Sequence, residues 1–244
     1  MGEKRECALI TGASSGIGLE IAKVLASQNY DLIICARREK ELQDLAEEIT
    51  REHTVNCKVI VADLTTEEGV DLLIKDSGDV DILVNNAGFG ILGDHLDMQL
   101  GRQLEMIELN IHALTRLSHV FGNLMVEKGK GRIMNVASIA SYISGPSFAV
   151  YCATKAYVLS YSRALHKELK NKGVTVTALC PGYVTTGFQE VAGMELSKME
   201  KLTSVPVKKV AEIAVKSMHK GKREVMPGIV NLSLIHISEP TRPY

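Results

Sequence analysis

The chain has 244 residues, a formal net charge of −1, and a composition that is 45% hydrophobic and 23% charged. These values are ordinary for a globular protein with a sizeable core, and they exclude the basic excess of a nucleic-acid-binding surface. No apolar run approaches the roughly 18–20 residues that span a bilayer, and the N-terminus leaves no room for a secretory signal, so we expect a cytoplasmic protein with no membrane segment.

Short apolar, β-branched runs alternate with helical periodicity along most of the chain. Strands are predicted at 7–12, 31–37, 57–64, 81–88, 132–138 and 174–182, with a short one at 223–227. Their near-continuous hydrophobicity is typical of strands covered on both faces. Helices are predicted at 16–28, 38–52, 96–127, 148–171 and 207–220, and the long segment 96–127 is expected to be bent or broken. The alternation predicts one α/β domain, a doubly wound parallel sheet of Rossmann type with about seven strands and helices on both faces.

The last thirteen residues, "LSLIHISEPTRPY" (232–244), do not continue this pattern. They resemble the in-frame translation of a sequencing-library adapter. We therefore expect the domain to occupy 1–231 and interpret 232–244 as a non-native tail. The alternative is a native tail with a chance match.

The first predicted strand runs into "TGASSGIG" (11–18), which opens the first helix. Glycines 12, 16 and 18 allow a sharp turn and a close approach of a ligand to the backbone. The helix that follows offers unpaired N–H groups and a positive dipole end to a phosphate. Many tight turns use glycine, but strand, turn, helix and a second strand are the context that a dinucleotide site requires.

The second predicted strand ends in "CARR" (35–38) rather than in an acidic residue. An acidic side chain there would bind the adenosine ribose and repel a 2′-phosphate, whereas arginine matches phosphate geometry. The alternative is that both arginines only begin a charged, solvated helix.

The segment "AVYCATKAY" (149–157) places Tyr151 and Lys155 one helical turn apart. They are either plain neighbours on a helix face or a pair in which the ammonium lowers the pKa of the phenol. Ser138, at the end of the fifth strand, and Asn110, in the long helical segment, could each be structural. The seven histidines show no metal-ligand spacing, so no metal site is expected, and the five separated cysteines suit free thiols.

Together these motifs resemble those of the short-chain dehydrogenase/reductase family. The resemblance includes "TGASSGIG", "NNAG" (85–88), Asn110, Ser138, Tyr151-x-x-x-Lys155 and "PGYVTT" (181–186), and it covers nearly all of residues 7–228. It implies an oxidoreductase that transfers a hydride between NADP(H) and a carbonyl or secondary alcohol. Tyr151 would be the acid/base, Lys155 its pKa modulator, Ser138 the substrate orienter and Asn110 the support of a proton relay.

The resemblance also implies the contacts of NADP(H). Arg37 would bind the 2′-phosphate, although Ser15 stands where some NADP-dependent members carry a basic residue, which leaves dual use with NAD open. Asn85 is expected to bridge neighbouring strands instead of binding cofactor. The implied cofactor residues are Gly12, Ser14, Ser15, Gly16, Ile17, Gly18, Arg37, Asp63, Leu64, Asn86, Ala87, Gly88, Tyr151, Lys155, Pro181, Gly182, Val184 and Thr186.

An apolar pocket for a small-molecule substrate is expected from Phe89, Ile139, Tyr142, Ile143, Tyr183 and Phe188, beneath a lid at 187–204. Family resemblance also implies a homo-oligomer. Two alternatives stay open. One is a 3-oxoacyl-thioester reductase within the same family, and the other is a sensor that binds NADP(H) without turnover.

Overall fold

The computed structural model describes residues 5–184, 192–193 and 204–228. The predicted tail at 232–244, nearly all of the predicted lid, and the side chains of Thr186 and Phe188 lie outside these residues. Among the helices of the described residues, none is both long and apolar enough to cross a bilayer.

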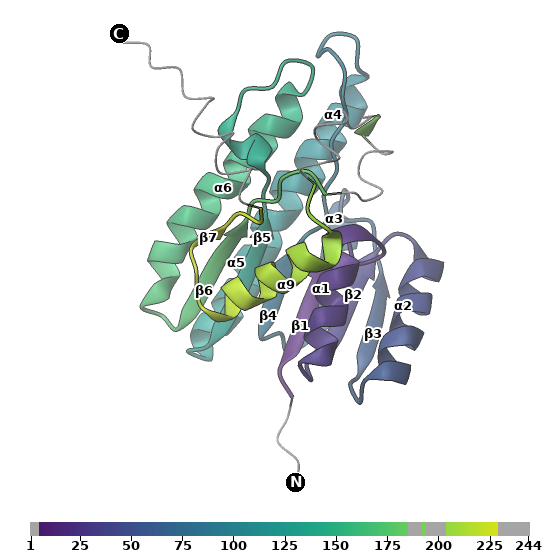
Figure 1. Ribbon diagram of the computed structural model, residues 1–244, viewed down its shortest axis with the longest axis vertical. Helices are drawn as coiled ribbons and strands as arrows, with labels where there is room; N and C mark the ends of the chain where they lie inside the picture. The colour runs from purple at the N-terminus through teal and green to yellow at the C-terminus, as the bar shows by residue number, and fades with distance from the viewer. Residues whose placement is uncertain (1–4, 185–191, 194–203, 229–244) are drawn as a thin grey trace.

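Seven parallel strands form one sheet, as the alternating pattern predicts (Figure 1). The strand order is β3-β2-β1-β4-β5-β6-β7, so the chain winds first to one edge and then, from β4, to the other. Ligands in such sheets bind where the order reverses, at the carboxyl ends of the strands. The strands are β1 (Cys7–Thr11), β2 (Asp31–Ala36), β3 (Cys57–Val61), β4 (Ile82–Asn85), β5 (Gly131–Val136), β6 (Val174–Leu179) and β7 (Glu224–Val225).

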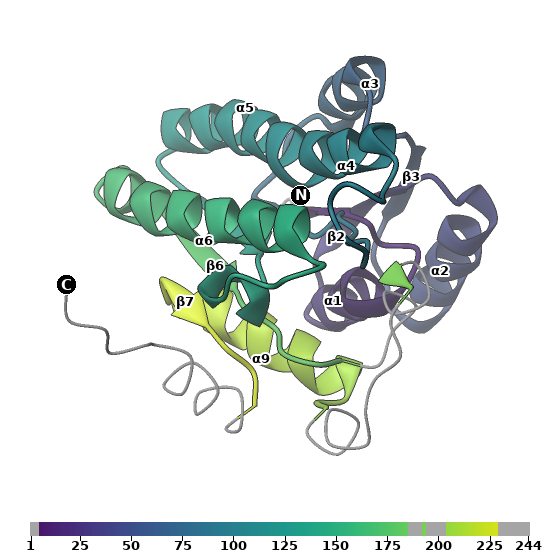
Figure 2. The ribbon, with the colours of Figure 1, turned by 90° about the horizontal axis from the view of Figure 1, so that it is seen from above.

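Helices cover both faces of the sheet, which confirms the doubly wound fold (Figure 2). Successive residues of β1 serve the two sides, since Ile10 packs in one core and Leu9 in the other. One face carries α1 (Gly16–Ser27), α2 (Glu39–Glu52) and α9 (Val207–His219). The other face carries α3 (Glu67–Ser77), α4 (Leu100–Ile107), α5 (Leu114–Glu127) and α6 (Ala149–Lys170).

Three details differ from the sequence predictions or sharpen them. The predicted strands 57–64, 81–88, 132–138 and 174–182 end two to three residues early, because their last residues form loops at the site. Helix α3 was not predicted, although Thr66 caps it by accepting a hydrogen bond from the N–H of Gly69 at 3.1 Å. The expected break in 96–127 is confirmed as a π-helical turn, Glu108–Ala113, between α4 and α5.

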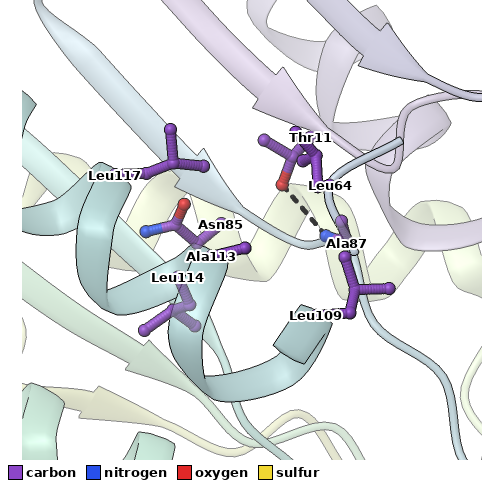
Figure 3. Close-up of a pocket in the computed structure, with 8 residues that line it drawn as sticks. All are labelled: Thr11, Leu64, Asn85, Ala87, Leu109, Ala113, Leu114 and Leu117. Atoms are coloured by element: carbon purple, nitrogen blue, oxygen red, sulfur yellow. Dashed lines mark hydrogen bonds between the residues drawn. The ribbon is translucent and has the colours of Figure 1, made fainter. Parts of the chain in front are cut away.

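Below the strand ends the structure is tightly packed. Asn85 bridges neighbouring elements as predicted: its Nδ2 donates to Asn135 Oδ1 on β5 and to Ser118 Oγ on α5, both at 2.9 Å. Figure 3 shows Asn85 beside Thr11 at a small internal cavity of about 10 Å³. A space of this size is about that of one water molecule, so an organic ligand cannot enter it.

Candidate active site

A cleft of about 600 Å³ lies at the carboxyl ends of the central strands. It joins the glycine-rich turn before α1 to the first turn of α6, which is the size and place expected for a cofactor site. Of the predicted site residues, Gly18 and Asn110 do not line it. The predicted residues that do are Gly12, Ser14, Ser15, Gly16, Ile17, Arg37, Asp63, Leu64, Asn86, Ala87, Gly88, Ser138, Tyr151, Lys155, Pro181, Gly182 and Val184.

The glycine-rich turn is fastened to the end of β4. Thr11 Oγ1 accepts hydrogen bonds from the backbone N–H groups of Asn86 and Ala87, each at 3.0 Å. The amide of Asn86 donates back to the carbonyl oxygens of Thr11 and Gly12 at 2.9 and 3.1 Å. At Gly12, where φ is +66°, a Cβ would lie 2.8 Å from Ala87 Cα. Only glycine allows this close approach. The glycine-rich turn (11–18) and the end of β4 together form an open cradle for a ligand.

Two arginines border the far end of the cleft. Arg37 forms an ion pair with Asp63, with 3.7 Å between Arg37 Nη1 and Asp63 Oδ2. The guanidinium of Arg38 instead donates to Ser14 Oγ at 2.9 Å and to Ser15 Oγ at 2.7 Å. Arg38 thus lies against the glycine-rich turn and Arg37 against the end of β3, and both line the cleft, where an anionic group of a ligand would meet positive charge.

Burial keeps the proton on the phenol of Tyr151. The residue is 7% exposed in the first turn of α6, and its ring stacks on Phe148 at 4.4 Å between centroids. Burial raises the pKa of Tyr151 above its ordinary value, while a hydrogen bond with Ser138 opposes the rise. In the protein alone the pKa of Tyr151 is thus raised on balance, because desolvation outweighs the other effects, and the role of Lys155 as modulator of this pKa stays a prediction.

Lys155 is buried beside that tyrosine. Its Nζ donates to the backbone oxygen of Val136 at 2.8 Å and lies 5.8 Å from the centroid of the Tyr151 ring. Burial lowers the pKa of Lys155 to about 8. The Lys155 side chain thus titrates closer to neutrality than an ordinary lysine, so its ammonium can release a proton, and its amine take one up, at modest cost.

Ser138 and Asn110 both have structural contacts as well. Ser138 Oγ caps the 3₁₀ turn η2 (Ile139–Tyr142) by accepting from the N–H of Ala140 at 3.1 Å. The Asn110 amide binds both backbone groups of Phe89, and it donates to Thr154 Oγ1 at 3.0 Å. Both N–H groups of Asn110 are thus already donated. The amide anchors the loop after β4, so the expected water-holding role does not fit its N–H groups.

The expected apolar wall is present in part. Phe89, Ile139, Ile143 and Tyr183 line the cleft. Tyr142 does not, and its placement in the substrate pocket is wrong. Its hydroxyl donates to the carboxylate of Glu224 on β7, because η2 directs this side chain toward the sheet edge.

Several site residues escaped the sequence prediction. Thr11 is the first residue of "TGASSGIG", and its hydroxyl accepts hydrogen bonds from the turn after β4. A hydroxyl residue directly before the glycine-rich turn was the sequence signal for this contact. Thr154 was not predicted, although it lies between Tyr151 and Lys155, and its Oγ1 accepts a hydrogen bond from Asn110 Nδ2. Ser141 Oγ donates to the backbone oxygen of Lys155 at 2.7 Å, and nothing in its sequence neighbourhood indicates that contact.

The lowered pKa of Lys155 predicts a pH-dependent contribution to stability. Its folded pKa of about 8 lies below the ordinary 10.5, so between these values only the unfolded chain binds the proton. Stability therefore rises with pH in this window. We expect the Tm difference between the wild type and Lys155→Met to shift in favour of the wild type from pH about 8 to about 10. Calorimetry in matched buffers measures it; a constant difference would mean that the folded protein keeps the proton.

Within the described residues, no three His, Cys, Asp or Glu side chains gather in a metal-binding group. The doubly wound fold and the cleft at its switch point are those of a nucleotide-binding α/β protein. A sequence profile described as short chain dehydrogenase matches residues 6–197. The chain belongs to the short-chain dehydrogenase/reductase family.

Relatives and solved structures agree with this assignment. The chain is 35% identical over 211 residues to a 3-oxoacyl-[acyl-carrier-protein] reductase of Haemophilus influenzae, covering 84% of each. It is 32% identical over 203 residues to an uncharacterised oxidoreductase of Staphylococcus epidermidis, covering 82% of this chain and 86% of the relative. A short-chain dehydrogenase from Sphingobium yanoikuyae in complex with NADPH superposes with a TM-score of 0.85 at 27% identity, covering 98% of both chains.

Proposed function

We propose that the protein is an NADP(H)-dependent oxidoreductase that interconverts a carbonyl and a secondary alcohol. The observation that carries this proposal is one continuous cleft, which begins at the glycine-rich turn and ends at Ser138, Tyr151 and Lys155. A nucleotide bound in the cradle would extend toward the groups that handle a proton on a substrate oxygen.

The residues present fit a dinucleotide. A Cβ at Gly12 would fill the space against Ala87, and a Cβ at Gly88 would lie 2.7 Å from Asn110 Oδ1. Ser15, Gly16 and Ile17, at the N-terminus of α1, line the same cleft and suit a pyrophosphate. Pro181, Gly182 and Val184 line its other end and would contact the nicotinamide, for which we keep the predicted Thr186 as a further partner.

When bound, NADPH supplies the hydride. The hydroxyl of Ser138 holds the substrate oxygen beside the phenol of Tyr151, with which it already shares a hydrogen bond. Tyr151 donates its proton to that oxygen as negative charge develops there. The nearby ammonium of Lys155 stabilises the phenolate that remains, and the backbone contact with Val136 holds the ammonium in place.

A preference for NADP over NAD is part of this proposal. Arg37 and Arg38 would bind the 2′-phosphate together, and Arg38 supplies the positive charge that is missing at Ser15. We expect Arg37→Ser with Arg38→Ser to raise the KM for NADPH by about 10- to 100-fold and to leave that for NADH nearly unchanged. Lys40→Ser is the matched control, because Lys40 is exposed on α2 and pairs with Asp44. Equal losses with both nucleotides would contradict the assignment.

A 3-oxoacyl thioester is the second candidate substrate class. Two relatives favour it: the Haemophilus reductase, and a very-long-chain 3-oxoacyl-CoA reductase of Anas platyrhynchos at 33% identity over 201 residues, covering 78% of this chain and 64% of the relative. The apolar wall formed by Phe89, Ile139 and Ile143 suits an acyl chain as well as a simple ketone.

The deciding experiment is NADPH oxidation, followed by absorbance, against ketones, aldehydes and 3-oxoacyl thioesters. Turnover of any of them supports the enzyme, and the best substrate decides between the two classes. Binding of NADPH without turnover across the panel would instead support the sensor.

We also propose a cytoplasmic homo-oligomer. All five cysteines are free thiols, in agreement with a reducing compartment. A second copy of the chain would pack on the face of α4 and α5, where Leu104 and Leu124 are exposed.

A further inference from the structure

A polar cluster lies behind the cleft, at the edge of the sheet formed by β6 and β7. We call Tyr142, Arg163, Cys180 and Glu224 the Tyr142 cluster. Tyr142 ends the turn η2, Arg163 lies on α6, Cys180 follows β6 and Glu224 is in β7. Four separate segments of the chain thus meet in one group of side chains.

Glu224 joins two of these segments through its two carboxylate oxygens. One oxygen accepts the hydroxyl of Tyr142, and the other accepts Arg163 Nε at 2.7 Å. The guanidinium carbon of Arg163 also lies 5.6 Å from the centroid of the Tyr142 ring. Hydrogen bonds to a charged partner are stronger than neutral ones, so these contacts fix η2 firmly against α6.

Tyr142 also reaches the end of β6. Its hydroxyl oxygen lies 3.7 Å from Cys180 Sγ, and Cys180 directly precedes Pro181. The backbone reinforces this connection, because the N–H of Ile139 donates to the oxygen of Pro181 at 2.9 Å. The segment that begins at Pro181 therefore cannot shift without moving η2.

The protonation states suit a permanent contact. Burial raises the pKa of Glu224, but the hydrogen bonds from Arg163 and Tyr142 and the charges of Arg163 and Arg223 together outweigh it, so the net effect is a lowered pKa. Burial, together with the neighbouring Cys180 and Glu224, raises the pKa of Tyr142. The phenol thus stays a donor and the carboxylate stays an acceptor across the neutral range.

Three of the four segments that the cluster joins carry part of the candidate site, β7 being the exception. Ser138 caps η2, Tyr151 and Lys155 lie on α6, and Gly182 and Val184 follow β6. None of the four cluster residues lines the cleft. An effect of the cluster on chemistry must therefore pass through the positions of other residues.

We propose that Tyr142 is a positioning residue, and that its cluster fixes Ser138 and the segment after β6 relative to Tyr151. This inference rests on the proposed function, because it concerns the geometry of the same reaction. A displacement of about 1 Å between such groups is enough to slow a reaction by about 100-fold.

The test compares Tyr142→Phe with Tyr157→Phe. Both variants remove one tyrosine hydroxyl, but that of Tyr157 on α6 bonds Thr115 on an exposed face, away from the cleft. We expect Tyr142→Phe to lower kcat about 10- to 100-fold with the KM for NADPH nearly unchanged, and Tyr157→Phe to retain the wild-type kcat. A kcat for Tyr142→Phe equal to that of the control overturns the proposal.

Hydrogen exchange provides a readout that does not depend on turnover. In Tyr142→Phe, amide exchange should rise together in residues 139–143 and 180–184 and stay unchanged in β1, since the Tyr142 hydroxyl that ends the first segment contacts Cys180 at the start of the second. A rise in only one of them, or in neither, overturns the proposal. If the wild type turns over no carbonyl substrate, the proposed function fails, and the exchange result alone decides the role of the cluster.

Glu224→Gln covers the case in which Tyr142→Phe fails to fold. Glutamine keeps an acceptor for the hydroxyl of Tyr142 but removes the charge that Arg163 contacts. We expect the same exchange pattern and a smaller fall in kcat than in Tyr142→Phe. Wild-type kcat and exchange in this variant would contradict the proposal.

Discussion

Tyr151→Phe is expected to lower kcat by about 10²- to 10⁴-fold, because it removes the one buried phenol that hydrogen-bonds Ser138 in the cleft. The ring would remain stacked on Phe148, so the fold and the nucleotide cradle should keep their shape. The measurement is steady-state NADPH oxidation with the best substrate, together with a fluorescence titration of NADPH binding.

Interpretation of that result depends on two controls. Tyr157→Phe, on the same helix, should retain the wild-type rate. NADPH affinity of Tyr151→Phe should stay within about threefold of wild type, since a lost proton donor affects the transition state and leaves ground-state binding alone. A Tyr151→Phe enzyme with the wild-type kcat would show that another group delivers the proton.

Gly12→Ala is expected to weaken NADPH binding by about 100-fold or more. The new Cβ would lie 2.8 Å from both Ala87 Cα and Asn86 Nδ2, and the φ of +66° disfavours any L side chain. A backbone atom cannot yield as a flexible side chain does, so the turn and the end of β4 must separate. Fluorescence titration with NADPH measures the loss directly.

The matched control is Gly101→Ala, in α4, where a Cβ would meet nothing within 4 Å. It should bind NADPH as the wild type does and gain about 0.5–1 kcal/mol of stability from helix propensity. Wild-type NADPH affinity in Gly12→Ala would mean that the nucleotide does not use this turn.

The fold could be predicted from sequence because its signals are local and repeated. The runs at 31–36 and 82–84 are hydrophobic almost throughout, and they form the buried strands β2 and β4, as that pattern predicts for parallel strands covered on both faces. The predicted strands extend too far at these ends because Ala62, Leu64 and Ala87 are apolar and read as strand, although they line the cleft. Helix α3 was overlooked because "TTEEG" is polar, and its capping signal lies in Thr66 rather than in periodicity.

The site was predictable where motif order carries the information, and less so where a contact depends on side-chain direction. Tyr151, Lys155 and Ser138 meet at one cleft as expected. Tyr142 differs because its direction is set by a short 3₁₀ turn and by Glu224, which lies 82 residues away in the chain. The pKa of Tyr151 depends on how completely the ring is buried, and no spacing rule reports that.

The bonds between Thr11 and Asn86 join residues that are 75 positions apart in the sequence. The cradle therefore cannot assemble from local contacts alone, because β1 must pair with β4 across the two βα units that separate them in the sequence. Contacts of such long range are made late and slowly during folding. A nucleotide can therefore bind only to chains in which β1 and β4 have already paired. Its binding is expected to slow unfolding and to have little effect on the rate of folding.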